Sequence, residues 1–168
     1  VFCYDSAPTL NNCKVWRNRA NRNGGGIYFF CSAPILRECI FSENEADYGG
    51  GVAHYGGYPV LEEREHFFPA WPDRLLYIEV LHGDSFSVFK DCEISKNEGN
   101  HGGGIYNGRS DSVFQDCVIT ENRGMYGAGM YECGSNPTFE DCLLSKNTAH
   151  LKGGAIYRLA EYEEVRKA

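Results

Sequence analysis

The stretch Val113-Phe114-Gln115-Asp116-Cys117-Val118-Ile119-Thr120-Glu121-Asn122 recurs 25 residues later as Thr138-Phe139-Glu140-Asp141-Cys142-Leu143-Leu144-Ser145-Lys146-Asn147. Both copies place a large apolar residue three positions before a cysteine and an asparagine five positions after it. Three earlier segments share this spacing, so the pattern occurs five times. Its cysteines are Cys13, Cys39, Cys92, Cys117 and Cys142, and its asparagines are Asn18, Asn44, Asn97, Asn122 and Asn147. A fixed period of this kind indicates a repeat architecture.

The length and composition of the repeat predict a right-handed parallel β-helix. Apolar residues alternate or form short runs between Gly, Pro and Asn, which is typical of strands. Three short strands with three turns use roughly 25 residues, and stacked turns of this kind bury a continuous core. A sandwich or a propeller does not place the same residue type at one position of every repeat. We therefore expect an all-β solenoid of about six coils over residues 1–158.

The two repeated polar positions are expected to form ladders along the axis of the solenoid. Stacked asparagines can hydrogen-bond one another and the backbone of the turns. The cysteines lie between apolar positions, so we expect them to point inward as buried, mostly reduced thiols. Cys3, Cys31 and Cys133 lie outside this column and are the better candidates for disulfides. Cysteine usage therefore leaves the cellular compartment open.

One segment departs from the repeat. Counting 25 residues on from Cys39 and Asn44 places Arg64 at the cysteine position and Pro69 at the asparagine position. We expect an irregular third coil or a loop over residues 56–85. Residues 159–168 read as a short polar helix or cap. Because the chain opens within a repeat, we expect it to be part of a longer protein.

Charge and hydropathy limit the classes of partner. The 168 residues carry a net charge of −7, which argues against binding to a nucleic-acid backbone. No run approaches the ~18 apolar residues that a membrane-spanning helix needs, so no direct membrane span is expected.

Paired motifs within the repeat resemble those of a known family. Phe41-Ser42-Glu43-Asn44 with Gly49-Gly50-Gly51-Val52, and Leu144-Ser145-Lys146-Asn147 with Gly153-Gly154-Ala155-Ile156, resemble the FxxN and GGA[ILV] motifs of polymorphic outer membrane protein repeats. More broadly, the chain looks like the pectate-lyase-like β-helix superfamily. The first resemblance implies a surface adhesin or passenger domain, and the second includes polysaccharide lyases and hydrolases.

Tyrosines follow the glycine clusters in four repeats. If the apolar residue before each one points inward, alternation turns the tyrosine outward. The resulting stripe is either a contact surface for sugars or proteins, or a self-stacking ladder that covers the strands. Its members are Tyr28, Tyr106, Tyr131 and Tyr157.

The irregular third coil is where an enzyme of this fold would place its site. Glu62, Glu65 and Asp73 supply acids, Arg64 a base and Trp71 an aromatic surface. Such groups suit glycoside hydrolysis or elimination from a uronate. The same residues also fit an ordinary solvated loop.

A column of acids precedes the ladder cysteines. Asp91, Asp116 and Asp141 at a spacing of about 5 Å would repel one another or trap a cation, which makes them weak candidates for calcium. They also fit turn-forming residues that the repeat has copied.

Together these features favour a non-catalytic function. We expect an extracellular or cell-surface structural and adhesive segment that contacts other protein chains or cell-surface glycans, with no cofactor beyond possible calcium. Trp71 and the tyrosines would form the contact surface. The alternative is a polysaccharide lyase or glycoside hydrolase with its site around the third coil.

Overall fold

The computed structural model describes residues 1–56 and 86–160. All regular elements in these ranges are strands, and no helix there is long and apolar enough to cross a membrane. The strands fall into four sheets, which we name A to D. Sheet A contains β1 (Phe2–Tyr4), β4 (Ile27–Phe30), β8 (Val52–Tyr55), β12 (Ile105–Gly108), β16 (Met130–Cys133) and β20 (Ile156–Leu159).

The other three sheets complete each coil. Sheet B contains β2 (Thr9–Asn11), β5 (Ile35–Arg37), β9 (Val88–Lys90), β13 (Val113–Gln115) and β17 (Thr138–Glu140). Sheet C contains β3 (Lys14–Trp16), β6 (Ile40–Ser42), β10 (Glu93–Ser95), β14 (Val118–Thr120) and β18 (Leu143–Ser145). Sheet D contains β7 (Glu45–Tyr48), β11 (Glu98–His101), β15 (Arg123–Tyr126) and β19 (Thr148–Lys152).

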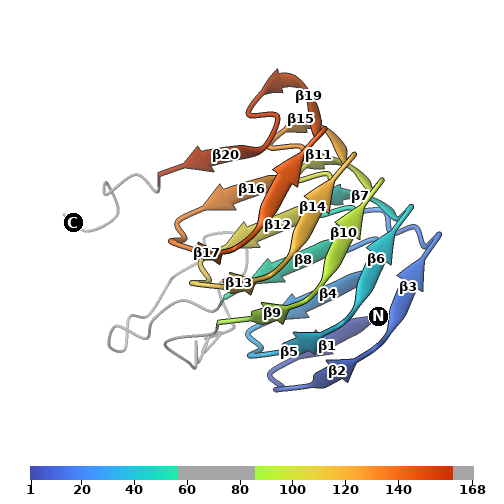
Figure 1. The fold of residues 1–168 in the computed structure, drawn as a ribbon, viewed down its shortest axis with the longest axis vertical. Helices are drawn as coiled ribbons and strands as arrows, with labels where there is room; N and C mark the ends of the chain where they lie inside the picture. The colour runs from blue at the N-terminus through green and yellow to red at the C-terminus, as the bar shows by residue number, and fades with distance from the viewer. Residues whose placement is uncertain (57–85, 161–168) are drawn as a thin grey trace, which may run out of the picture.

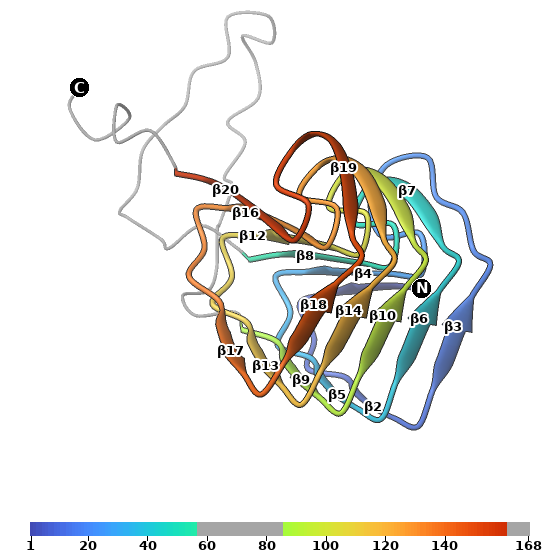
Figure 2. The ribbon, with the colours of Figure 1, turned by 45° about the horizontal axis from the view of Figure 1, so that its top comes forward.

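The predicted right-handed parallel β-helix is confirmed. Every strand pairs in parallel with the equivalent strand of the next coil, so the chain climbs in a regular stack (Figure 1). After the first coil, which has three strands, each coil contains four strands where three were expected. The additional strand belongs to sheet D and directly follows the repeated asparagine. The oblique view in Figure 2 shows the strands of sheet C as one row along the stack.

The described coils number about five, against about six predicted, because the second coil pairs directly with the coil that begins at β9. β5 pairs with β9, β6 with β10, β7 with β11 and β8 with β12. The irregular coil or loop predicted at 56–85 lies outside the described residues except for Gly56, and so does most of the cap predicted at 159–168. The strands on either side of residues 57–85 thus keep the register of an uninterrupted stack.

The core fills the space that the four sheets enclose. Aromatic residues stack along the axis inside sheet B, with the ring centroids of Phe89 and Phe114 4.7 Å apart. Aliphatic residues line sheets A and C, where Ile94, Ile105 and Ile119 are at most 1% exposed. Burial of such side chains stabilises each coil by about 1.5–3 kcal/mol per residue.

The repeated asparagines form a hydrogen-bonded ladder. Asn97 Nδ2 donates to Phe41 O at 2.9 Å and to Asn122 Oδ1 at 3.0 Å. Its own Oδ1 accepts from the backbone N–H of Asn44 at 3.0 Å and from Asn44 Nδ2 at 3.1 Å. The side chains therefore satisfy turn groups that no strand can reach.

Two turns of each coil place a non-glycine residue in the left-handed region. One column, at φ 50–52°, precedes the ladder cysteines, and the other, at φ 53–57°, precedes the asparagines. The first consists of Asn12, Glu38, Asp91, Asp116 and Asp141, and the second of Arg17, Glu43, Lys96, Glu121 and Lys146. Asn and Asp tolerate this region better than most residues do, which accounts for their frequency in the first column.

Glycine is required where sheet D turns into sheet A. A Cβ at Gly103 would lie 2.1 Å from Arg123 O, in the next coil. The glycine clusters therefore permit close contact between the backbones of stacked coils.

Candidate functional site

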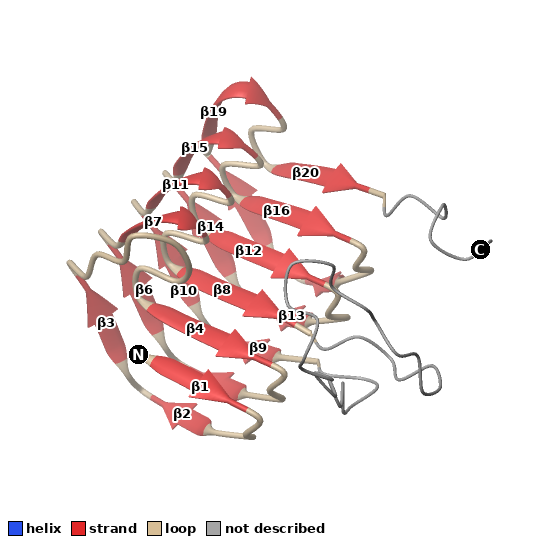
Figure 3. Cartoon of the chain, turned by 180° about the vertical axis from the view of Figure 1, so that it is seen from behind, coloured by secondary structure: helices blue, strands red, loops and turns tan. Residues whose placement is uncertain are grey.

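The outward side of sheet A is aromatic. Along β4, Ile27 and Phe29 point into the core, whereas Tyr28 and Phe30 point outward and are partly buried. The same alternation holds in the other strands of this sheet, which Figure 3 shows from behind. We call the outward set the aromatic face; it consists of Phe2, Tyr4, Tyr28, Phe30, Tyr55, Tyr106, Tyr131 and Tyr157.

Rings of the aromatic face stack along the axis of the solenoid. Tyr106 and Tyr131 lie 5.5 Å apart at 12°, and Tyr4 and Phe30 lie 5.6 Å apart at 22°. Neighbouring rings thus cover one another's faces, which leaves mainly ring edges to a partner. The first coil is more open, since Phe2 is 62% and Tyr4 61% exposed. Burial raises the pKa of Tyr106 and Tyr131, so their hydroxyls stay protonated at neutral pH.

A second aromatic column lies at the ends of the strands of sheet D. His101 stacks between Tyr48 and Tyr126, at 4.9 Å and 5.4 Å. The column meets the aromatic face edge-on, with His101 and Tyr131 5.0 Å apart at 89°. We call Tyr48, His101 and Tyr126 the corner column. The sequence analysis missed it, although the signal was present: an aromatic residue directly before the glycine cluster in three repeats.

Burial shapes the chemistry of the corner column. Desolvation lowers the pKa of His101, although the Asp47 carboxylate opposes the shift. Within the described part of the chain, His101 Nδ1 is buried and has no hydrogen-bond partner. His101 is therefore predominantly neutral at pH 7, and its ring is held by stacking.

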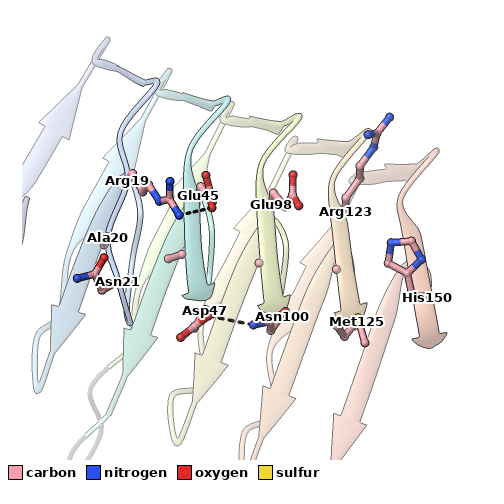
Figure 4. A pocket seen from close by; sticks show the side chains of 13 residues that line it. Arg19, Ala20, Asn21, Glu45, Asp47, Glu98, Asn100, Arg123, Met125 and His150 are labelled. Carbon is pink, nitrogen blue, oxygen red and sulfur yellow. Dashed lines mark hydrogen bonds and ion pairs between the residues drawn. The ribbon is translucent and has the colours of Figure 1, made fainter.

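A polar groove runs along the outside of sheet D (Figure 4). Three of its lining residues, Asp47, Asn100 and Met125, directly precede the corner column in the chain. It has a volume of about 390 Å³. A small residue stands between the two lining side chains of each of the first four coils, and the lining side chains form two rims. In the strands of sheet D this small residue is buried, whereas its neighbours on the rims are exposed. The small residues are Ala20, Ala46, Gly99 and Gly124. One rim consists of Arg19, Glu45, Glu98 and Arg123, and the other of Asn21, Asp47, Asn100, Met125 and His150.

Interactions between coils order the rims of the groove. Arg19 pairs with Glu45 at 3.3 Å, and Asn100 Nδ2 donates to Asp47 Oδ1 at 2.9 Å. The groove offers hydrogen-bond donors, acceptors and both signs of charge along the axis. Such a surface suits an extended polar partner.

The structure describes only some of the residues predicted to form a site. The four predicted tyrosines all lie on the aromatic face, although Ala53 stands between Tyr28 and Tyr106. The residues of the enzymatic alternative, together with Trp71, lie outside the described residues; these are Glu62, Arg64, Glu65 and Asp73.

The predicted calcium column consists of exposed turn residues. Asp91, Asp116 and Asp141 each adopt a left-handed φ of 50–52°. Within residues 1–56 and 86–160, no group of three or more His, Cys, Asp or Glu side chains is placed to hold one metal ion.

All eight cysteines lie in the described part of the chain and remain thiols. Cys3, Cys31 and Cys133, the better candidates for disulfides on sequence grounds, are partly buried thiols in this structure. The ladder cysteines point inward, and burial raises the pKa of Cys39 and of Cys142. Buried thiols of this kind react slowly.

The interior also contains a polar cluster near the point where β8 ends. His54 is 1% exposed; its Nε2 donates to Ser32 O at 2.9 Å, and its Nδ1 accepts from Ser87 Oγ at 2.6 Å and Ser110 Oγ at 2.8 Å. Desolvation lowers the pKa of His54 to about 4, so the ring is neutral at pH 7. The cluster is buried in the interior, and its hydrogen bonds hold neighbouring turns together.

A family model described as "Right handed beta helix region" matches residues 78–167, just over half of the chain. No curated protein and no solved structure matches the chain.

Proposed function

The chain belongs to the right-handed β-helix family, and from that premise we propose that it is an extracellular or cell-surface structural and adhesive segment that contacts other protein chains or cell-surface glycans. The aromatic face carries this proposal. Aromatic side chains are enriched at interfaces, where their large apolar area and polar edges contribute most of the binding energy. The adjoining polar groove supplies hydrogen-bonding groups beside it.

We further propose that the repeats are of the type found in polymorphic outer membrane proteins. The asparagine of each FxxN motif lies in the hydrogen-bonded ladder, as Asn44 and Asn97 do. The glycines of the second motif lie at the turn into sheet A. Both motifs thus have structural roles that support this repeat type, and the resemblance in turn supports a surface-exposed, adhesive protein.

Binding to glycan arrays and to isolated cell-surface proteins tests the proposal. The double variant Tyr4→Ser/Phe30→Ser removes two stacked rings from the aromatic face. We expect at least about a tenfold loss of affinity, since removing an aromatic anchor from an interface costs roughly 2 kcal/mol. Trp16→Ser is the control, because Trp16 is an exposed aromatic residue of sheet C, at 45%.

Two results would reject the proposal. Equal losses in Trp16→Ser and in Tyr4→Ser/Phe30→Ser would show that binding does not depend on the aromatic face. Release of unsaturated uronates or new reducing ends from any glycan would instead establish the polysaccharide-active alternative. Circular dichroism of each variant verifies that the solenoid is intact.

A further inference from the structure

The ladder cysteines stack in register through the interior of the solenoid. The backbone N–H after each ladder cysteine donates to the carbonyl of the cysteine in the preceding coil: Glu93 N to Cys39 O and Val118 N to Cys92 O, both at 2.9 Å. The same bond occurs between Ile40 and Cys13 and between Leu143 and Cys117. Adjacent cysteines are therefore separated by one coil, or about 4.8 Å.

All the ladder thiols have similar surroundings. Cys117 Sγ lies 3.1 Å from Gln115 O in its own coil and 3.5 Å from Phe89 O in the preceding one. The three central cysteines are at most 1% exposed, whereas Cys13 and Cys142 at the two ends are only partly buried. The ladder is thus a continuous row of sulfur atoms that is partly open at each end.

This spacing suits a metal bridge better than a disulfide. A disulfide needs sulfur atoms about 2.05 Å apart and a torsion near ±90°, which parallel side chains in register do not provide. A linear sulfur–metal–sulfur bridge has no such torsional requirement. With metal–sulfur bonds no longer than the roughly 2.3 Å of a zinc–thiolate bond, it spans at most about 4.6 Å, close to the repeat of the coils.

We propose that adjacent thiols of the ladder bind Cu(I), a soft monovalent cation, in two-coordinate sulfur bridges, as between Cys92 and Cys117. Soft sulfur ligands select this ion. The ladder presents two ligands at a time, and the described residues supply no third one beside them. This arrangement matches linear coordination and not the tetrahedral set that zinc requires.

The binding step involves no change of oxidation state. Two thiols and one Cu(I) give one neutral bridge of a thiolate, the metal and a thiol, and one proton leaves to the solvent. A neutral bridge keeps net charge out of the apolar core, where an unpaired charge is costly. In this arrangement Cys117 is the protonated ligand, and its thiol still donates a hydrogen bond to Gln115 O.

Three double variants test the proposal, and each lacks two of the eight thiols. If each thiol serves one bridge, five stacked thiols bind about two Cu(I) ions per chain. Cys31→Ala/Cys133→Ala leaves the ladder intact and should bind about two ions. Cys13→Ala/Cys142→Ala leaves three adjacent thiols and should bind about one. Cys39→Ala/Cys117→Ala also leaves three thiols in the ladder, but no two of them are in adjacent coils, so it should bind no copper.

The measurement is the copper content after anaerobic loading with the acetonitrile complex of Cu(I) and gel filtration, with circular dichroism to verify folding. Equal copper content in the three variants would show binding by thiol number alone and would overturn the proposal. X-ray absorption of the loaded wild-type protein is independent of variant folding. It should show two sulfur neighbours per copper; three or more, or oxygen neighbours, would likewise overturn the proposal.

Discussion

The Asn97 side chain hydrogen-bonds four backbone and side-chain groups of the two neighbouring coils, so its contribution to the free energy of unfolding should exceed that of a surface amide. Asn97→Ala would leave Phe41 O and the backbone N–H of Asn44 buried without partners. We expect a loss of about 3 kcal/mol in the free energy of unfolding, measured by denaturant titration. Asn18→Ala is the control, because Asn18 is exposed at the end of the ladder and should lose only about 1 kcal/mol. Equal losses would contradict a role for the ladder in stability.

His54 makes stability sensitive to acid. Its pKa in the folded protein, about 4, lies below the ordinary value of 6.5, so the unfolded chain binds more protons between these values. The contribution of His54 is therefore complete above about pH 6.5 and is lost as the pH falls towards 4, by about 3 kcal/mol. Unfolding free energies measured across this range should fall more steeply for the wild type than for His54→Gln. Parallel curves would show that the ring is not buried in its neutral form.

At the level of strands and turns, the left-handed columns predict an unusual preference for glycine. Glu121 has a φ of 57° and is exposed. Glu121→Gly should be at least about 1 kcal/mol more stable than Glu121→Val, because β-branched residues avoid this region. At Thr120, the last residue of β14, the order should reverse, because strands favour valine over glycine. Thermal unfolding of the four variants provides the comparison, and the same order at both positions would exclude the turn as the cause.

The last strand of sheet A is held by an ion pair. Arg158 Nε lies 2.6 Å from Oε2 of Glu132, which is fully buried. Arg158→Gln should lower the free energy of unfolding by about 2–3 kcal/mol at pH 7, because the Glu132 carboxylate stays buried without its cation. Glu132→Gln/Arg158→Gln, which removes both charges, should be more stable than Arg158→Gln; the opposite order would argue against this pair.

The strands differed in how well the sequence predicted them. Sheets B and C were recognisable because large apolar residues such as Phe114 and Ile119 alternate with polar ones at fixed positions. Sheet D was not, since strands such as Glu98–His101 consist of polar residues and glycine, which have low strand propensity. The groove and the corner column lie on sheet D and were missed for the same reason. Their formation depends on stacking between coils, which no single repeat reveals.

At the scale of the whole molecule, stability should vary along the axis. Each coil contacts only its neighbours, so the terminal coils have fewer partners than the central ones. Amide hydrogen exchange should therefore be slowest in β10, between β6 and β14, and faster in β3 and β18 at the two edges of sheet C. Uniform protection across sheet C would instead indicate that the solenoid unfolds as one cooperative unit.

The distance between stacked asparagines along the chain shows how tolerant this architecture is. Asn97 and Asn122 are 25 residues apart, yet Asn44 and Asn97 are 53 residues apart and make the same contacts. The pitch of the stack is therefore independent of how much polypeptide separates two neighbouring coils at this corner. The corner between β8 and β9 is therefore an insertion site. Evolution or protein engineering can exchange the sequence inserted there without changing the stacked coils.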